Sequence, residues 1–437
     1  MRLSSILLSP GGALVVVGLV TILNQALLTS ASIYNNNDEN HHHYQQQQQP
    51  QQQEHQEDFT VDVNAGLHKN GGVDFRMGGG FPRIDFQYIS LEEAASASDY
   101  EAPKARMDGH SEAETDLQSK CLLFSDEFDK LDRSVWRSYD LNVTNTFVRN
   151  GIFYIRPTLT ENRIGIKALR ETGVLDFWGS DPGTQCTGNY DYGCFRVAGA
   201  GGNILNPIQS GMVRSVNAFK FRYGKVVVRA KMPKGKWIWP AIWMLPAHYQ
   251  YGTWPASGEI DLIESRGNGP EYPGGGYNTV SSTLHWGPSY EYNRFQMTHA
   301  EHILPHGRSF ADEFHVFTLD WTPEGLKTYV DDDLLLDVPF NNMFKKGKFP
   351  AWMDNPWEGS DTAPFDQEFY LIMNVAVGGT AGYFPDGVGN KPWSDKSEHA
   401  VNEFYAAKDE WYPSWGPENG LDRALAIDYI RVYKHNC

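Results

Sequence analysis

The chain has 437 residues, with 54 acidic and 37 basic side chains and a formal net charge of −17. A chain this acidic is a poor partner for the phosphates of nucleic acids or for anionic membrane surfaces, so both classes of binding protein are disfavoured. It is rich in aromatic residues, with 13 Trp, 22 Tyr and 23 Phe, and every tryptophan lies at or beyond position 136.

Residues 1–31 have the pattern of a secretory signal peptide. Arg2 precedes an apolar run over residues 13–23, and small residues follow as far as Ala31. This run is short for a membrane span, so we predict cleavage near Ala31, a secreted product and no stable membrane insertion afterwards. The alternative is an uncleaved signal anchor, which would give a type II membrane protein.

Residues 32–118 are predicted to form a disordered extension. Runs of Asn, His and Gln occupy residues 35–57, and the segment as a whole holds 16 acidic against 5 basic side chains. Such a polar tract buries too little apolar surface to fold. The remaining residues, 119–437, are long enough for one large domain.

That domain contains four cysteines, Cys121, Cys186, Cys194 and Cys437. In a secreted protein they are expected to pair, and three connectivities are possible. We favour Cys186–Cys194, which closes a short loop, together with Cys121–Cys437, which joins the two ends of the domain. Asn142 opens the only Asn-x-Ser/Thr sequon and is the predicted glycosylation site.

Short strands and turns dominate the domain, and helical periodicity is scarce. Residues 147–155 predict two strands around an Asn-Gly turn, and residues 326–336 repeat this pattern around an Asp turn. Residues 368–377 form a nearly continuous apolar run, as the centre of a sandwich requires. The long loops over residues 264–282 and 379–395 are expected to flank a cleft.

The segment Gly258-to-Glu264, GEIDLIE, interleaves three carboxylates with Ile and Leu, which predicts a β-strand. Glu259 and Asp261 then share one face, whereas Glu264 points the other way on a regular strand. A β-bulge at Leu262 and Ile263 would bring Glu264 back to the same face. Two carboxyl groups about 5–5.5 Å apart are what a retaining glycosidase needs. The alternative interpretation is a solvated acidic strand face.

Aromatic residues surround these acids in the sequence. Trp239 lies in the segment WIWPAIWMLP, and Trp254 precedes Glu259 by five residues in a turn. Sugar rings stack on indoles, so an aromatic cleft around carboxylates suits a carbohydrate. His285 lies on the next apolar strand and is a candidate contact for a sugar hydroxyl.

Seven segments in this order resemble glycoside hydrolase family 16, and within it the animal branch of β-1,3-glucanases and β-1,3-glucan recognition proteins. The resemblance covers about residues 120–437. The segments are KVVVRAK, WIWPAIWMLP, GEIDLIE, LHWG, FHVFTLDW, NVAVGGTAGYFP and IDYIRVY.

The resemblance implies an all-β jelly-roll sandwich of two antiparallel sheets with a concave carbohydrate-binding cleft. Glu259 matches the family nucleophile, Asp261 the assisting acid and Glu264 the general acid/base. Trp254 matches an aromatic residue beside the cleaved bond, and His285 a cleft histidine.

The predicted activity is endo-hydrolysis of β-1,3-glucan by a monomer, with no cofactor in the reaction. The resemblance also implies one structural calcium ion, with Glu127 and Asp428 in the matching places. The alternative is a non-catalytic glucan recognition protein of innate immunity. Because all three acids are present and residues 32–118 do not look like a glucan-binding module, we favour the enzyme. Preference for β-1,3 over mixed β-1,3/1,4 linkages stays open.

Overall fold

The computed structural model describes residues 63–67, 73–77, 121–138, 144–176, 194–305, 307–435 and 437. The predicted signal peptide, most of the predicted extension, Asn142 and Cys186 lie outside these residues. Within the extension, β1 (Val63–Leu67) and β2 (Val73–Met77) form an antiparallel hairpin. No helix in the described part of the chain is long and apolar enough to span a membrane.

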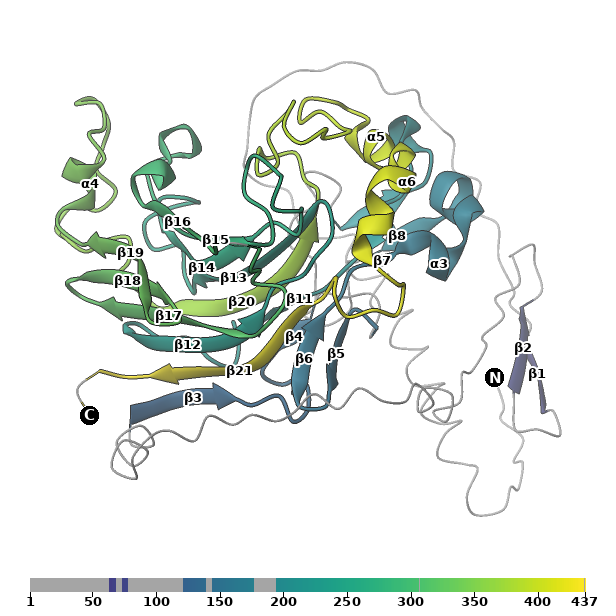
Figure 1. Ribbon diagram of the computed structural model, residues 1–437, viewed down its shortest axis with the longest axis horizontal. Helices are drawn as coiled ribbons and strands as arrows, with labels where there is room; N and C mark the ends of the chain where they lie inside the picture. Colours follow the sequence, from purple (N-terminus) through teal and green to yellow (C-terminus); the bar gives the residue numbers. More distant parts are fainter. Residues whose placement is uncertain are drawn as a thin grey trace, which may run out of the picture. The chain divides into compact units, whose positions relative to one another are not determined.

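Residues 105–437 form one compact unit built on two antiparallel sheets (Figure 1). The seven-stranded sheet runs in the order β16 (His299–Ile303), β15 (Thr279–His285), β14 (Glu259–Ser265), β13 (Ile238–Pro246), β20 (Phe369–Val377), β11 (Met212–Arg214) and β4 (Arg137–Ser138). The eight-stranded sheet contains β19 (Asp333–Pro339), β18 (Gly325–Val330), β17 (His315–Thr322), β12 (Gly224–Lys231), β21 (Leu425–Tyr433), β6 (Ile152–Ile155) and β5 (Thr146–Arg149), with β3 (Leu122–Asp126) also paired to β21. The predicted all-β sandwich is confirmed.

Short elements connect these sheets. Two further strand pairs are β7 (Thr158–Leu159) with β10 (Ile208–Gln209), and β8 (Val174–Asp176) with β9 (Phe195–Val197). The α-helices are α3 (Thr160–Ile164), α4 (Met343–Lys346), α5 (Ala400–Ala406) and α6 (Lys408–Trp411). Single helical turns are η3 (Ala168–Thr172), η4 (Ala200–Gly202), η5 (Tyr290–Tyr292), η6 (Phe295–Met297) and η7 (Tyr412–Trp415).

The core lies between the two sheets because each strand alternates its apolar side chains. On β12, Val226 and Val228 are fully buried, and Lys225 between β17 and β21 is exposed. Ile242 of β13 and Phe317 of β17 belong to the same buried cluster, so one core holds both sheets together. Burial of this apolar surface is the main force that stabilises the sandwich.

Both hairpins expected from the sequence are present. Asn150 and Gly151 have φ angles of 55° and 73° between β5 and β6, as a tight turn with two left-handed residues requires. Asp331 has a φ of 54° between β18 and β19. The apolar run over residues 368–377 forms β20, which pairs with β13 and β11 inside the seven-stranded sheet.

The two ends of the domain meet at β3 and β21. Their pairing places Leu122 opposite Tyr433, and a disulfide joins Cys121 to Cys437 with 5.5 Å between the Cα atoms. This confirms the predicted Cys121–Cys437 pairing across a sequence separation of 316. Cys194 is also disulfide-bonded and buried, but its predicted partner Cys186 lies outside the described residues.

Candidate active site

The three carboxylates lie on β14, and the strand carries the expected bulge. Asp261 pairs with Trp243 and Ile263 pairs with Ile242, so Leu262 has no partner on β13. The register with β15 shifts between Asp261 and Glu264 in the same way. Because one residue is skipped, Glu264 returns to the face that carries Glu259 and Asp261.

Glu264 is held by an indole at one end of the group. The Nε1 of Trp239 on β13 donates a hydrogen bond of 2.8 Å to Glu264 Oε1. Tyr383, from the loop after β20, stacks on Trp239 with ring centroids 3.8 Å apart and an interplanar angle of 4°. The Arg266 guanidinium lies 4.1 Å from the centroid of the Tyr383 ring on its other flank. This stack fixes the indole that fixes Glu264.

Glu259 is held by a second indole at the other end. The Nε1 of Trp254 donates a hydrogen bond of 2.6 Å to Glu259 Oε2. The Trp254 ring also contacts His285, with centroids 5.5 Å apart. Trp239 and Trp254 thus both lie beside the acids, and each engages a different glutamate.

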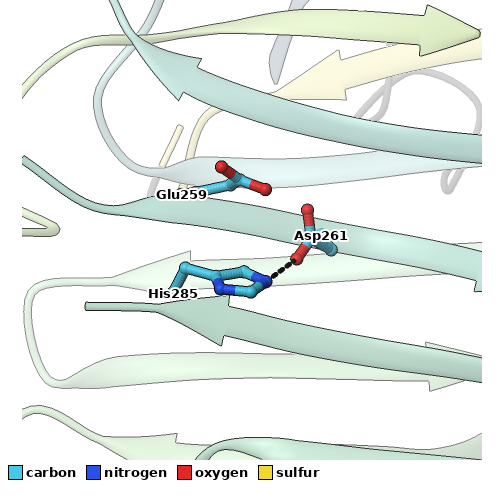
Figure 2. Close-up of side chains that lie close together, drawn as sticks. All are labelled: Glu259, Asp261 and His285. Carbon is cyan, nitrogen blue, oxygen red and sulfur yellow. Dashed lines mark ion pairs between the residues drawn. The ribbon is translucent and has the colours of Figure 1, made fainter. Parts of the chain in front are cut away.

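His285 lies at the end of β15, directly opposite Glu259, and its Nε2 is 3.3 Å from Asp261 Oδ2 (Figure 2). The Asn293 side chain fixes which ring nitrogen carries the proton. Asn293 Oδ1 accepts from the backbone N–H groups of Trp286 and Phe295, so its Nδ2 faces His285 Nδ1 at 2.7 Å. Nδ1 therefore accepts, and the Nε2–H points at Asp261.

The environment disfavours ionisation of all three carboxyls. Burial raises the pKa of Glu259, and the neighbouring charge of Asp261 raises it further. Burial and the charge of Glu264 raise the pKa of Asp261, and burial raises the pKa of Glu264 against the lowering effect of the Trp239 hydrogen bond. Burial and like charge thus both favour the protonated forms of these carboxyls.

We expect Asp261→Asn to stabilise the fold near neutral pH. The pKa of Asp261 in the folded protein lies above its ordinary value of 3.8. Below pH 3.8 the carboxyl is protonated in both the folded and the unfolded state, so its full contribution to stability is present there. The contribution is lost as the pH rises through the folded pKa. The asparagine avoids this loss, and we expect a gain of about 1–2 kcal/mol at pH 7 that vanishes below about pH 4.

Thermal unfolding of both proteins between pH 3.5 and 7.5 measures this difference. Asp332→Asn, in an exposed turn, is the matched control and should leave the pH profile unchanged. An Asp261→Asn protein that is equally stable, or less stable, across the whole range would contradict the account.

Three residues that contact side chains of the site were not identified from the sequence. Tyr383 belongs to the Gly/Pro-rich loop expected to flank the cleft, and Asn293 follows the LHWG segment. Asn374 of β20 accepts a hydrogen bond of 2.6 Å from Trp243 Nε1. In the sequence, each of them is recognisable only as a polar or aromatic residue in or near a motif.

The predicted calcium ligands do not fit a calcium site. Both carboxylate oxygens of Glu127 accept hydrogen bonds from Arg431, at 2.8 and 2.7 Å. Asp428 is paired with Arg229. The lone pairs that would bind a cation are engaged by guanidinium groups, so these two residues do not fit a calcium ion in this arrangement. In the described part of the chain, the one cluster of three metal-capable groups is Glu259, Asp261 and His285.

Comparison with known proteins identifies a family and several relatives that this chain is similar to. The model for "Glycosyl hydrolases family 16" matches residues 203–361. A beta-1,3-glucan-binding protein from Penaeus monodon is 47% identical over 336 residues, covering 72% of this chain and 90% of that protein. Beta-1,3-glucan-binding protein 1 from Galleria mellonella is 33% identical over 342 residues, covering 71% of this chain and 63% of that protein.

A bacterial relative has an enzyme name. Glucan endo-1,3-beta-glucosidase A1 from Niallia circulans is 39% identical over 225 residues, covering 52% of this chain and 26% of that protein. The chain thus spans less than two thirds of the length of the Galleria and Niallia proteins.

Proposed function

The chain belongs to glycoside hydrolase family 16, and from that premise we propose that it cleaves β-1,3-glucan internally, with retention of the β configuration. The observation that carries the proposal is the bulged strand, which presents Glu259, Asp261 and Glu264 on one face with a separate indole on each glutamate. An acid group of this kind costs stability, because burial and like charge both penalise it. Catalysis is the use that explains its presence.

Glu259 acts as the nucleophile in this proposal. Its Oε2 is occupied by the Trp254 N–H, which leaves Oε1 to attack the anomeric carbon. The hydrogen bond from Trp254 lowers the pKa of Glu259, opposing the effect of burial and so favouring the ionised form that attack requires.

Glu264 acts as the acid and then as the base. Trp239 donates to Oε1, which leaves Oε2 to carry the proton that the departing sugar oxygen receives. Burial raises the pKa of this carboxyl and so favours the protonated form that the acid needs. In the second half of the reaction Glu264 takes a proton from water, and that water releases the sugar from Glu259.

The geometry of the strand determines how the side chains of Glu259 and Glu264 must be oriented. Two same-face steps along a strand separate their Cα atoms by roughly 13 Å. A retaining pair needs its carboxyl groups at about 5–5.5 Å, so both long side chains must incline towards the shorter Asp261 between them. Asp261 Oδ2 lies 3.3 Å from His285 Nε2, and Asp261 exchanges a proton with Glu259, which holds the nucleophile in place between the two steps.

The reaction in this form uses water and side chains only, so we propose no cofactor. We also propose that the protein is secreted and acts as a monomer on the polysaccharide. The bonded Cys121–Cys437 pair suits an oxidising compartment, where disulfides form and persist.

A second function is favoured by the names of the Penaeus and Galleria relatives, which are glucan-binding proteins. In that case the same cleft would hold β-1,3-glucan without cleaving it, in recognition rather than degradation. The two functions share the ligand and differ only in whether the carboxylates act on it.

Incubation with laminarin distinguishes the two functions. The enzyme releases reducing sugar in proportion to time and protein concentration, whereas the binding protein retains laminarin and releases none. Parallel reactions with lichenan and barley glucan measure the preference for β-1,3 over mixed linkages. Absence of both binding and cleavage on laminarin would overturn the proposal.

A further inference from the structure

The side-chain amide of Asn293 has only one orientation that satisfies its neighbours. Its Oδ1 accepts from the backbone N–H of Trp286 at 3.3 Å and from that of Phe295 at 3.2 Å. Rotation of the amide by half a turn would present its NH2 group to both of these donors. The turn therefore fixes the amide, and Nδ2 is left to face His285 Nδ1 at 2.7 Å.

The backbone of this turn is also held in place. The N–H of Asn293 donates 3.2 Å to the carbonyl of Tyr290, and the N–H of Arg294 donates 2.8 Å to the carbonyl of Trp286. The Arg294 side chain donates 2.9 Å from Nε to the carbonyl of Gly347, on a segment distant in the chain. Asn293 therefore meets His285 from a backbone that is anchored on both sides of it.

The His285 ring is confined by two aromatic neighbours. Phe295 stacks on it with centroids 5.2 Å apart and an interplanar angle of 26°, and Trp254 lies 5.5 Å away at 41°. The backbone of His285 pairs with that of Glu259 across the sheet. With ring and amide both held, the protonation pattern of the ring follows from the hydrogen bond at Nδ1.

The atom that His285 Nε2 faces is an unpartnered oxygen. Asp261 is 3% exposed, and its Oδ2 accepts no hydrogen bond within the described part of the chain. His285 Nε2 lies 3.3 Å from this oxygen (Figure 2). A proton on Nε2 makes this contact attractive. A bare Nε2 would place its lone pair against the carboxylate oxygen, or would take the proton of a protonated Asp261.

We propose that Asn293 is a positioning residue of the site, which holds His285 with its proton on Nε2 so that the ring cannot take the proton that Asp261 shares with Glu259. This inference rests on the proposed function, because the shared proton has a task only in the glycosidase. A hydrogen bond joins the two carboxyls. The proton passes from Glu259 to Asp261 as Glu259 ionises to attack, and the ring offers it no third place.

Asn293→Asp replaces the donor that faces Nδ1 by an acceptor at nearly constant shape. The introduced carboxylate still accepts from the two backbone N–H groups, so we expect the turn to survive. Imidazole 15N shifts at pH 7.5, above the ordinary histidine value of about 6.5, report the protonated nitrogen. We expect His285 to carry its proton on Nε2 in the wild type and to have Nδ1 protonated in the variant. The signals lost in His285→Gln identify the ring.

Asn293→Asp should also make activity depend on the protonation of the ring. Its ring can donate to Asp261 only while both nitrogens are protonated, so kcat on laminarin should fall as the pH rises. At pH 8 we expect a loss of about tenfold against the wild type, the scale on which an unsatisfied buried acceptor acts, with KM little changed.

The charged groups around the ring are few in the described structure. Glu259, Asp261 and Glu264 face it from β14, and the turn after η5 adds the introduced carboxylate. Arg294 of the same turn is bonded to a backbone carbonyl. The fall in kcat with rising pH therefore reports the ring, provided that it disappears when the ring is replaced.

Two further proteins separate positioning from a structural role. Asn341→Asp, at an exposed residue before α4, introduces the same charge and should leave both tautomer and pH profile unchanged. In His285→Gln there is no tautomer to set, so adding Asn293→Asp should produce no new pH dependence. An Asn293→Asp loss that is equal at every pH and persists in the His285→Gln background overturns the proposal.

The wild-type spectrum decides the assignment even if the variant does not fold. A wild-type His285 with its proton on Nδ1 overturns the positioning role and leaves the proposed hydrolase intact. A wild-type protein that binds laminarin without releasing reducing sugar overturns the hydrolase, whereas the spectra still show whether Asn293 sets the tautomer.

Discussion

Replacing Glu259 by glutamine is expected to reduce laminarin hydrolysis by roughly 10⁴-fold or more, the scale on which loss of a catalytic nucleophile acts. The amide cannot form the glycosyl-enzyme, but it has nearly the same size and can still contact the Trp254 N–H through its oxygen. Folding and laminarin binding should therefore survive. Reducing-sugar release and calorimetric affinity, measured on the same preparation, separate turnover from binding.

The matched control for this variant is Glu368→Gln. Glu368 precedes β20 and pairs with Lys220 at 3.5 Å, with about half of its side chain exposed to solvent. This change also converts a carboxylate into an amide, but away from the acids, and should leave hydrolysis unaltered. Near-normal activity in Glu259→Gln would refute the assignment of the nucleophile.

Glu264→Gln should give a different defect, one that depends on the leaving group. Laminarin has a poor leaving group that needs a proton, so we expect hydrolysis to fall by about 10³-fold, within the range of a lost general acid. An aryl β-glucoside oligomer with an acidic phenol leaves without that proton. Its first, phenol-releasing step should proceed at close to the wild-type rate, which rapid-mixing measurements of phenol release can follow.

External azide completes this test. Without Glu264 as base, water attacks the glycosyl-enzyme slowly, but azide needs no base and should restore turnover to give a β-glycosyl azide. Glu259→Gln should not respond in this way, because it forms no glycosyl-enzyme. Equal loss on laminarin and on the activated substrate, with no azide effect, would show that Glu264 is not the acid/base.

The arrangement of the three acids could be predicted because it depends on the residue pattern of one short segment. Alternation of Ile and Leu with acids specifies a strand, and the odd spacing between Asp261 and Glu264 calls for a bulge if all three share a face. Trp254 and Trp239 could be selected for the same reason, since each is near the acids in sequence or in a strong motif.

The partners that fix these groups could not be predicted from local patterns. Tyr383 reaches Trp239 from a distant loop, and Asn293 reaches His285 through a turn whose shape no pattern specifies. The ion pairs of Glu127 and Asp428 could not be predicted for a related reason. Arg431 and Arg229 face the two acids because of the register between β3, β21 and β12, and that register is a property of the folded sheet.

The anomeric form of the first sugar released from laminarin tests the central claim most directly. Two carboxyl groups acting in turn on one bond transfer the sugar twice, so the new reducing end must appear first as the β-anomer and convert to the α-anomer only by mutarotation. Proton NMR during the first minutes of digestion follows both forms. Early β-anomer is the predicted result; early α-anomer, or no new reducing end while laminarin binds, would contradict the account.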